Sequence, residues 1–182
     1  VILQEPAGQS YSISASPNPA DLGATVRLFV SGTTPGDSIR WTASPDLSFS
    51  CQNCPGPELT AVESATITAI ITDAQGCTTK LSLPLTVNVV RNLYIPTAFS
   101  PNQDGRNDRF EPYPGSGVER VLKMEIYDRW GGLLFESDSP APAWDGQAAG
   151  EPLNNGVYVY QIEVEWIDGA IRRYSGEVNL LR

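Results

Sequence analysis

The residues from Ser100 to Glu111 have the types and spacing of a calcium-binding loop. Calcium takes six to eight oxygen ligands, and an EF-hand loop supplies them from positions 1, 3, 5, 7, 9 and 12, with a glycine at position 6. With Gly105 as that glycine, five of the six positions carry a suitable ligand, and Ser100 stands where a carboxylate is usual. The predicted calcium ligands are Asn102, Asp104, the main-chain carbonyl of Arg106, Asp108 and Glu111.

The same loop also fits a sharp turn without a metal. Asn and Asp side chains accept hydrogen bonds from backbone amides two residues further on, and a glycine adopts positive φ at little cost. No helical pattern flanks the loop, and Pro112 follows Glu111 directly. Calcium is therefore a candidate cofactor, and a turn closed by Asx hydrogen bonds is the competing hypothesis.

Cys51, Cys54 and Cys77 are the only cysteines, and the first two are spaced C-x-x-C. Structural zinc needs four ligands, and without histidine the fourth would have to be a carboxylate. A redox C-x-x-C pair would need a βαβ setting, which the sequence lacks. We therefore expect a disulfide between Cys77 and either Cys51 or Cys54, formed in an oxidising compartment.

Three aromatic side chains near polar turns, Tyr127, Trp130 and Trp144, form either a recognition patch or part of a core. Arg129 precedes Trp130 and is able to stack on an aromatic ring or to bind a carboxylate of a partner. The pair Asp145-Gly146 has the composition of a turn directly after Trp144.

The composition argues against catalysis. The 182 residues include no histidine, which removes the commonest general base and most hydrolase triads. The spaced carboxylates Glu163 and Glu165 are typical of a solvated strand face, and no glycine-rich phosphate loop is present. We expect the protein not to be an enzyme.

The charge and the start of the chain indicate an exported protein without a nucleic-acid partner. A net charge of −9 repels phosphates. The apolar runs are too short to span a bilayer. Because the chain begins at Val1 without an initiator Met or a signal segment, we expect it to be a piece of a longer exported protein.

Alternating apolar residues predict strands in both halves of the chain. The first half has five such segments: 11–17, 24–32, 38–44, 65–73 and 80–90, the last with Pro84, which favours an edge strand. The second half has strands within 93–99, 121–128, 132–137, 156–166 and 170–181. We predict an all-β protein with two consecutive antiparallel Ig-like β-sandwich domains, residues 1–92 and 93–182.

The last two strands are expected to form a hairpin. With Asp168-Gly169 as a two-residue turn, Glu165 would face Arg172 across the strands. Alternation places Tyr158, Tyr160, Ile162, Val164 and Trp166 on the core face of the first of these strands.

Five ordered segments of the second half carry a family resemblance: "YIPTAFSPNQDGRNDRF", "MEIYDRWGGLLFES", "AWDG", "LNNGVYVYQIEV" and "SGEVNLLR". Together they resemble the gliding-motility-associated C-terminal domain, the type B sorting domain of the type IX secretion system of Bacteroidota. The matching motif residues are Ser100, Pro101, Asn102, Asp104, Gly105, Asn107, Asp108, Tyr127, Arg129, Trp130, Gly131, Trp144, Asp145, Gly146, Gly156 and Tyr158. Gln103 stands where the family usually has glycine, which predicts a different local backbone in the loop.

The resemblance implies that the second domain addresses a large exported protein, often a surface adhesin, to the outer-membrane translocon. It implies that the partners are this translocon and an outer-membrane partner protein, and that the chain is secreted or displayed at the cell surface. The first half resembles the Ig-like or PKD-like repeats that precede such domains. A calcium-dependent adhesin or a carbohydrate-binding β-sandwich is the alternative function.

Overall fold

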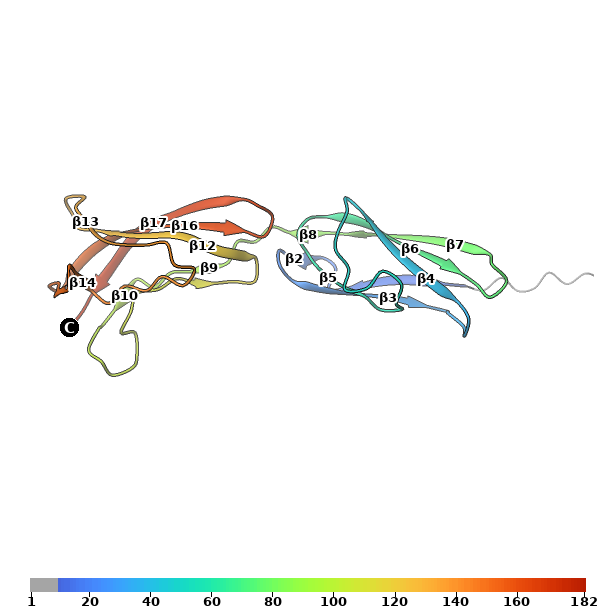
Figure 1. The fold of residues 1–182 in the computed structure, drawn as a ribbon, viewed down its shortest axis with the longest axis horizontal. Helices are drawn as coiled ribbons and strands as arrows, with labels where there is room; N and C mark the ends of the chain where they lie inside the picture. Colours follow the sequence, from blue (N-terminus) through green and yellow to red (C-terminus); the bar gives the residue numbers. More distant parts are fainter. Residues whose placement is uncertain (1–9) are drawn as a thin grey trace, which may run out of the picture. The chain divides into compact units, whose positions relative to one another are not determined.

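The computed structural model describes residues 10–182 and contains no helix in that range, so none of these residues forms a helix able to cross a membrane (Figure 1). The described chain is built from β-strands, which confirms the all-β prediction. It divides into two compact units, the first ending at Val89 and the second running from Val90 to Arg182. We describe each unit by itself.

Two three-stranded antiparallel sheets form the first unit, in the orders β1-β3-β5 and β4-β6-β7. A short parallel pair, β2 with β8, is a local exception to the predicted antiparallel arrangement. The strands are β1 (Ser12–Ser16), β2 (Ala20–Asp21), β3 (Thr25–Ser31), β4 (Ser38–Ser44), β5 (Glu58–Thr60), β6 (Ala65–Thr72), β7 (Thr78–Leu85) and β8 (Val87–Asn88).

The core of the first unit follows from strand alternation. Every second residue of β6 is buried, and Ile67, Ala69 and Ile71 are fully buried. The indole of Trp41 on β4 packs in the same core, and its Nε1 donates a hydrogen bond to the Cys54 carbonyl at 2.8 Å. These contacts place the C-x-x-C segment against the sheet.

The predicted strand 80–90 is divided in the structure. The side chain of Asn18 donates to the Pro84 carbonyl and accepts a hydrogen bond from the Thr86 amide. Because Thr86 is bound there and not in the ladder, β7 ends at Leu85. Pro84 lies on β7, at the edge of its sheet, as predicted.

The expected disulfide to Cys77 is wrong. Cys51 is bonded to Cys54, across a Cα–Cα distance of 5.9 Å, and Cys77 is exposed without a disulfide partner. The Asp73 carboxylate accepts hydrogen bonds from the amides of Gln75 and Cys77, which holds Cys77 in the β6–β7 turn. These hydrogen bonds make residues 73–77 a turn closed by the Asp73 side chain.

The second unit has one five-stranded sheet, in the order β10-β17-β16-β12-β13. Its opposite layer consists mainly of short two-stranded ribbons and loops, and β10 pairs with β17 in parallel (Figure 1). The strands are β9 (Leu93–Tyr94), β10 (Ala98–Phe99), β11 (Tyr113–Pro114), β12 (Val118–Tyr127), β13 (Leu133–Ser137), β14 (Gln147–Ala148), β15 (Glu151–Pro152), β16 (Gly156–Trp166) and β17 (Ile171–Leu180).

The core face predicted for β16 is confirmed. Ile162, Val164 and Trp166 are at most 1% exposed, whereas Val157, on the opposite face, is 50% exposed. Tyr160 is half-buried, and its ring centroid lies 5.3 Å from that of Phe110.

The predicted register of the final hairpin is wrong by one residue. Glu165 faces Ile171, and Arg172 faces Val164, because the loop contains three residues, 167–169, and not two. Gly169 has a φ of +76°, as a three-residue loop with a bulge requires. The ion pair of Glu165 is formed with Arg120 on β12, at 2.7 Å.

Candidate functional site

The loop between β10 and β11 is closed by its own Asn and Asp side chains. The two carboxylate oxygens of Asp108 accept hydrogen bonds from the amides of Gln103, at 2.7 Å, and Gly105, at 2.8 Å. The Asn102 side-chain oxygen accepts from the amide of Asp104, and Asp104 Oδ1 accepts from the amide of Arg106 at 2.8 Å. These are the Asx hydrogen bonds of the turn hypothesis.

The same hydrogen bonds bear on the calcium prediction. Backbone amides of the loop donate to Asn102 Oδ1, Asp104 Oδ1 and both Asp108 oxygens, and the Asn102 side-chain amide donates to Asp104 Oδ2. Glu111 is hydrogen-bonded to Tyr113. Within residues 10–182, no group of three or more acidic or cysteine side chains is placed to hold a metal ion. This arrangement does not fit a calcium ion and favours the turn hypothesis, so we derive no role for calcium. Calcium binding is the competing hypothesis, and the effect of calcium on Tm tests it.

Gln103 has a backbone conformation that is usual for glycine. Its φ is +66°, in the left-handed region that favours glycine, and Asn107 has a φ of +50°. The Gln103 amide bound by Asp108 holds the residue in this conformation. The loop therefore keeps a backbone suited to glycine although the residue is glutamine.

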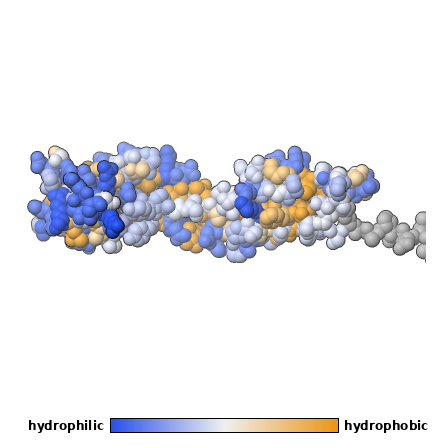
Figure 2. Space-filling view, turned by 90° about the horizontal axis from the view of Figure 1, so that it is seen from below, coloured by the Kyte–Doolittle hydropathy of each residue, from blue (hydrophilic) through white to orange (hydrophobic). Residues whose placement is uncertain are grey.

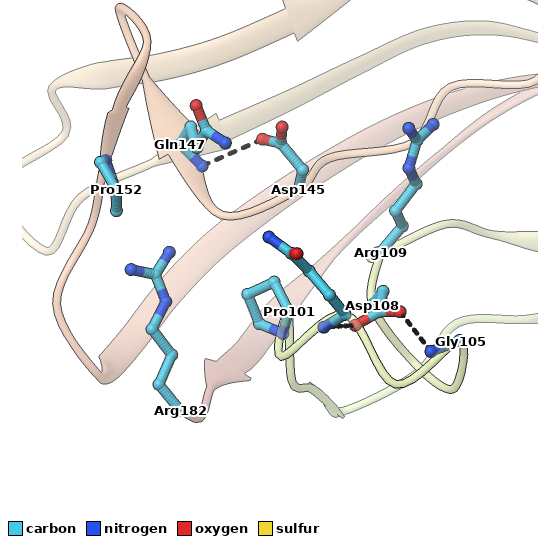
Figure 3. Close-up of a pocket in the computed structure, with 9 residues that line it drawn as sticks. Pro101, Gly105, Asp108, Arg109, Asp145, Gln147, Pro152 and Arg182 are labelled. Atoms are coloured by element: carbon cyan, nitrogen blue, oxygen red, sulfur yellow. Dashed lines mark hydrogen bonds between the residues drawn. The ribbon is translucent and has the colours of Figure 1, made fainter.

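A polar pocket of about 590 Å³ lies beside this loop. Figure 3 shows Arg109 and Arg182 on opposite sides of it, with Asp145 and Gln147 between them. Asp145 accepts a hydrogen bond from the Gln147 amide at 3.1 Å, which confirms the turn expected after Trp144. Figure 2, seen from the side on which the loop projects, shows a hydrophilic surface at this end of the second unit.

Gly146 packs against core residues and accepts a hydrogen bond from Arg182, which borders the polar pocket. Its φ is +78°, and a Cβ atom there would lie 2.9 Å from Leu180 Cδ1. Its carbonyl accepts hydrogen bonds from the Leu153 amide, at 3.0 Å, and from the Arg182 guanidinium, at 3.2 Å. Only glycine combines this φ with such close packing.

Trp144 is a core residue. Its side chain is 0% exposed, its Nε1 donates to the Gln147 carbonyl at 2.8 Å, and its ring centroid lies 5.2 Å from that of Phe99. The Tyr158 ring meets it edge-on at 5.3 Å, and the Tyr158 hydroxyl donates to the Asn154 carbonyl. For Trp144 the core hypothesis is therefore confirmed.

Trp130 has the opposite environment: its side chain is 86% exposed, at the turn between β12 and β13. Asp128 Oδ1 accepts hydrogen bonds from the amides of Trp130 and Gly132, both at 2.8 Å, and Gly131 has a φ of +84°. The Arg129 guanidinium carbon lies 5.9 Å from the indole centroid, which is the cation–π contact considered from the sequence. Tyr127, at the end of β12, is half-buried, and burial together with a hydrogen bond to Glu125 raises its pKa.

A shallow groove of about 500 Å³ lies beside Trp130 and is named the Trp130 groove here. The β12–β13 turn and the segment before β16 form it. It is lined by Asp128, Arg129, Trp130, Leu134, Leu153, Asn154, Asn155, Gly156, Val157 and Tyr158.

The structure therefore divides the motif residues between two places. The loop 100–108 and Asp145 border the polar pocket, whereas 129–130, Gly156 and Tyr158 border the Trp130 groove. Arg109, Arg182 and Gln147 were not identified from the sequence. No local pattern marks them, because they come together only when the loop, β14 and the end of β17 are folded.

Comparison with known protein families gives a match for the second unit. Residues 93–180 match the family model of the CHU_C type IX secretion signal domain. No curated protein matches the chain at a significant level. Among solved structures, the fibronectin(III)-like modules of Clostridium thermocellum CbhA are 12% identical, with a TM-score of 0.36, and the match covers 94% of this chain and 93% of theirs.

A tandem repeat from the extending region of a large adhesion protein is also 12% identical, with a TM-score of 0.40, over 93% of this chain and 48% of that one. The chain thus spans about half the length of that protein. Likenesses at this level carry no conclusion about function. The family match does: residues 93–180 match the CHU_C type IX secretion signal domain, and this signal indicates export to the cell surface or the medium.

Proposed function

We propose that the second unit is a non-catalytic address that brings an exported protein to the outer-membrane translocon of the type IX secretion system. The observation that carries the proposal is the family match over residues 93–180. The matched residues lie within the compact unit that begins at Val90, and this unit has its own core. The proposed address is therefore the surface of a folded domain.

The non-catalytic role rests on what the acidic side chains do. Asp108 and Asp145 accept hydrogen bonds from amides of their own turns, and Glu163 forms an ion pair with Arg173 at 3.0 Å on the exposed sheet face. These structural roles account for the carboxylates without a reaction. The sequence also offers no histidine as a general base.

For the first unit we propose an Ig-like spacer or adhesin repeat. Its support is the pair of three-stranded sheets with the Trp41 core, and the Cys51–Cys54 disulfide, a bond suited to an oxidising compartment. Atomic-force unfolding of tandem copies is the test, since a load-bearing spacer should unfold at a defined force. A unit that unfolds without resistance would contradict the spacer role.

Export of a reporter tests the address directly. A fluorescent protein fused ahead of residues 90–182 should reach the surface or medium of a host that has type IX secretion, and should stay inside a host that lacks the translocon. The matched control is the same reporter fused to the first unit, residues 1–89. Retention of both fusions in the competent host would reject the proposal.

A further inference from the structure

Most motif residues of the second unit have a structural reason. Trp144 fills the core, Gly146 allows close packing, and Asp108 and Asp145 close turns. Arg182, on the border of the polar pocket, is held by its hydrogen bond to the Gly146 carbonyl. Asp108, Asp145 and Arg182, which border the polar pocket, therefore each have a role in folding.

Trp130 has no such explanation. Its side chain is 86% exposed, although tryptophan is among the residues that gain most from burial. The Asp128 hydrogen bonds fix the turn, and Gly132 cannot carry a Cβ atom, which would lie 2.7 Å from Asp128 Oδ2. The β12–β13 turn thus holds the Trp130 indole in a fixed, solvent-exposed position.

The surroundings of Trp130 have the composition of a protein-binding centre. Leu134, Leu153 and Val157 line the groove beside the indole, and Val157 is 50% exposed. Tryptophan and arginine are enriched among the residues that contribute most to protein–protein affinity. Arg129 stands next to Trp130 and forms no ion pair within the described chain.

Charge indicates what the occupant presents. The chain carries a net charge of −9, yet within residues 10–182 the exposed Arg129 guanidinium forms no ion pair with a carboxylate. A partner carboxylate placed against Arg129 would pair with it, and an apolar recess beside it would receive the indole. An anionic lipid surface is disfavoured because the chain as a whole repels it.

We propose that Trp130 and Arg129 are the anchor by which a protein of the secretion machinery recognises this domain. The partner presents an apolar recess for the indole, flanked by a carboxylate for the guanidinium. This inference rests on the proposed function and makes it specific: recognition occurs at the Trp130 groove and not at the polar pocket.

The experiment uses the full chain with an N-terminal reporter in a host competent for type IX secretion. The variants are Trp130→Ala, Trp130→Phe and Arg129→Glu. The control is Phe29→Ala, because Phe29 is an aromatic residue of the first unit that is 48% exposed. A version that ends at Arg91 tests the address itself.

We expect Trp130→Ala to lower the exported fraction at least tenfold, as for a residue at the centre of an interface. Arg129→Glu should lower it several-fold by placing two carboxylates together, Trp130→Phe should lower it less than Trp130→Ala, and Phe29→Ala should leave it unchanged. Purified Trp130→Ala and wild-type chains should melt within about 2 °C of each other, since substitutions at exposed sites hardly change stability.

Each outcome separates the two proposals. If export needs residues 92–182 but Trp130→Ala and Arg129→Glu are exported like the wild type, the anchor is refuted and the address stands. If the version ending at Arg91 is exported normally, the address fails and the anchor fails with it. If Trp130→Ala is exported normally but loses binding on a glycan array, the groove is a carbohydrate site and the inference is wrong.

Discussion

Removal of the Arg91 side chain should weaken the second unit strongly, although Arg91 lies before the segment that matches the family. Its guanidinium donates two hydrogen bonds to the Asp168 carboxylate, at 3.1 and 2.6 Å, and lies 5.1 Å from the centre of the Trp166 ring. The two charged side chains are only 18% and 22% exposed. Arg91 thus ties the start of the unit to its last hairpin.

The magnitude follows from this partial burial. An exposed ion pair contributes about 0–1 kcal/mol, and breaking a fully buried one costs about 3–5 kcal/mol. A bidentate pair of intermediate burial should contribute about 2 kcal/mol, and the cation–π contact with Trp166 adds roughly 0.5–1 kcal/mol. For a unit of this size, Arg91→Ala should lower Tm by roughly 10–20 °C.

Denaturant unfolding of residues 90–182 is the assay. The matched control is Arg172→Ala, because Arg172 donates only to the carbonyl of its neighbour Ile171 and should cost less than about 0.5 kcal/mol. A double-mutant cycle of Arg91→Ala with Asp168→Asn should give a coupling free energy of about 1–2 kcal/mol.

The pH dependence gives a second check. Hydrogen bonds from Arg91 hold the pKa of Asp168 below its usual value. A carboxyl whose pKa is lowered by folding stabilises the protein above its unfolded pKa of about 3.9, and this contribution is lost as the pH falls through the folded pKa. The difference between wild type and Arg91→Ala should therefore be full at pH 7 and shrink below pH ~4.

Equal unfolding free energies for Arg91→Ala and Arg172→Ala would refute this reasoning. A difference that persists unchanged at acid pH would show that Arg91 acts through packing and not through the Asp168 carboxylate.

Three further outcomes follow from the geometry. Gly146→Ala should lower the free energy of unfolding by about 2–4 kcal/mol, because positive φ is combined with a close approach to Leu180. Gly131→Ala, with positive φ but open space, should lower it by about 1–2 kcal/mol. Denaturant unfolding compares the two variants, and equal losses would contradict the packing argument. Adding excess calcium or a chelator should leave Tm unchanged, because the loop oxygens bind its own amides; a rise of several degrees with calcium would restore the metal-loop hypothesis. Thiol titration of the unfolded, unreduced chain should find one reactive thiol, and Cys77→Ser should remove it; a chain without reactive thiol would mean that Cys77 is oxidised.

Local sequence patterns predicted the strands well. The segment 38–44 coincides with β4, and 156–166 coincides with β16, because alternating burial needs only neighbouring residues to be read. The register of the last hairpin was off by one residue, because the sequence does not show whether Ile167 belongs to the strand or to the loop. The start of β12 at Val118 was also missed.

What the sequence by itself determined is local: the strand faces, the turn at Asp145 and the ordered blocks that resemble the family. The tertiary structure alone decided that Trp144 is core while Trp130 stands in water, since both follow the same kind of sequence pattern. It also decided that Cys51 pairs with Cys54 and that Arg91 reaches Asp168, 77 residues away. The physical reason is that a side chain's burial and long-range partners depend on which strands become neighbours, and strand pairing is fixed by the whole core.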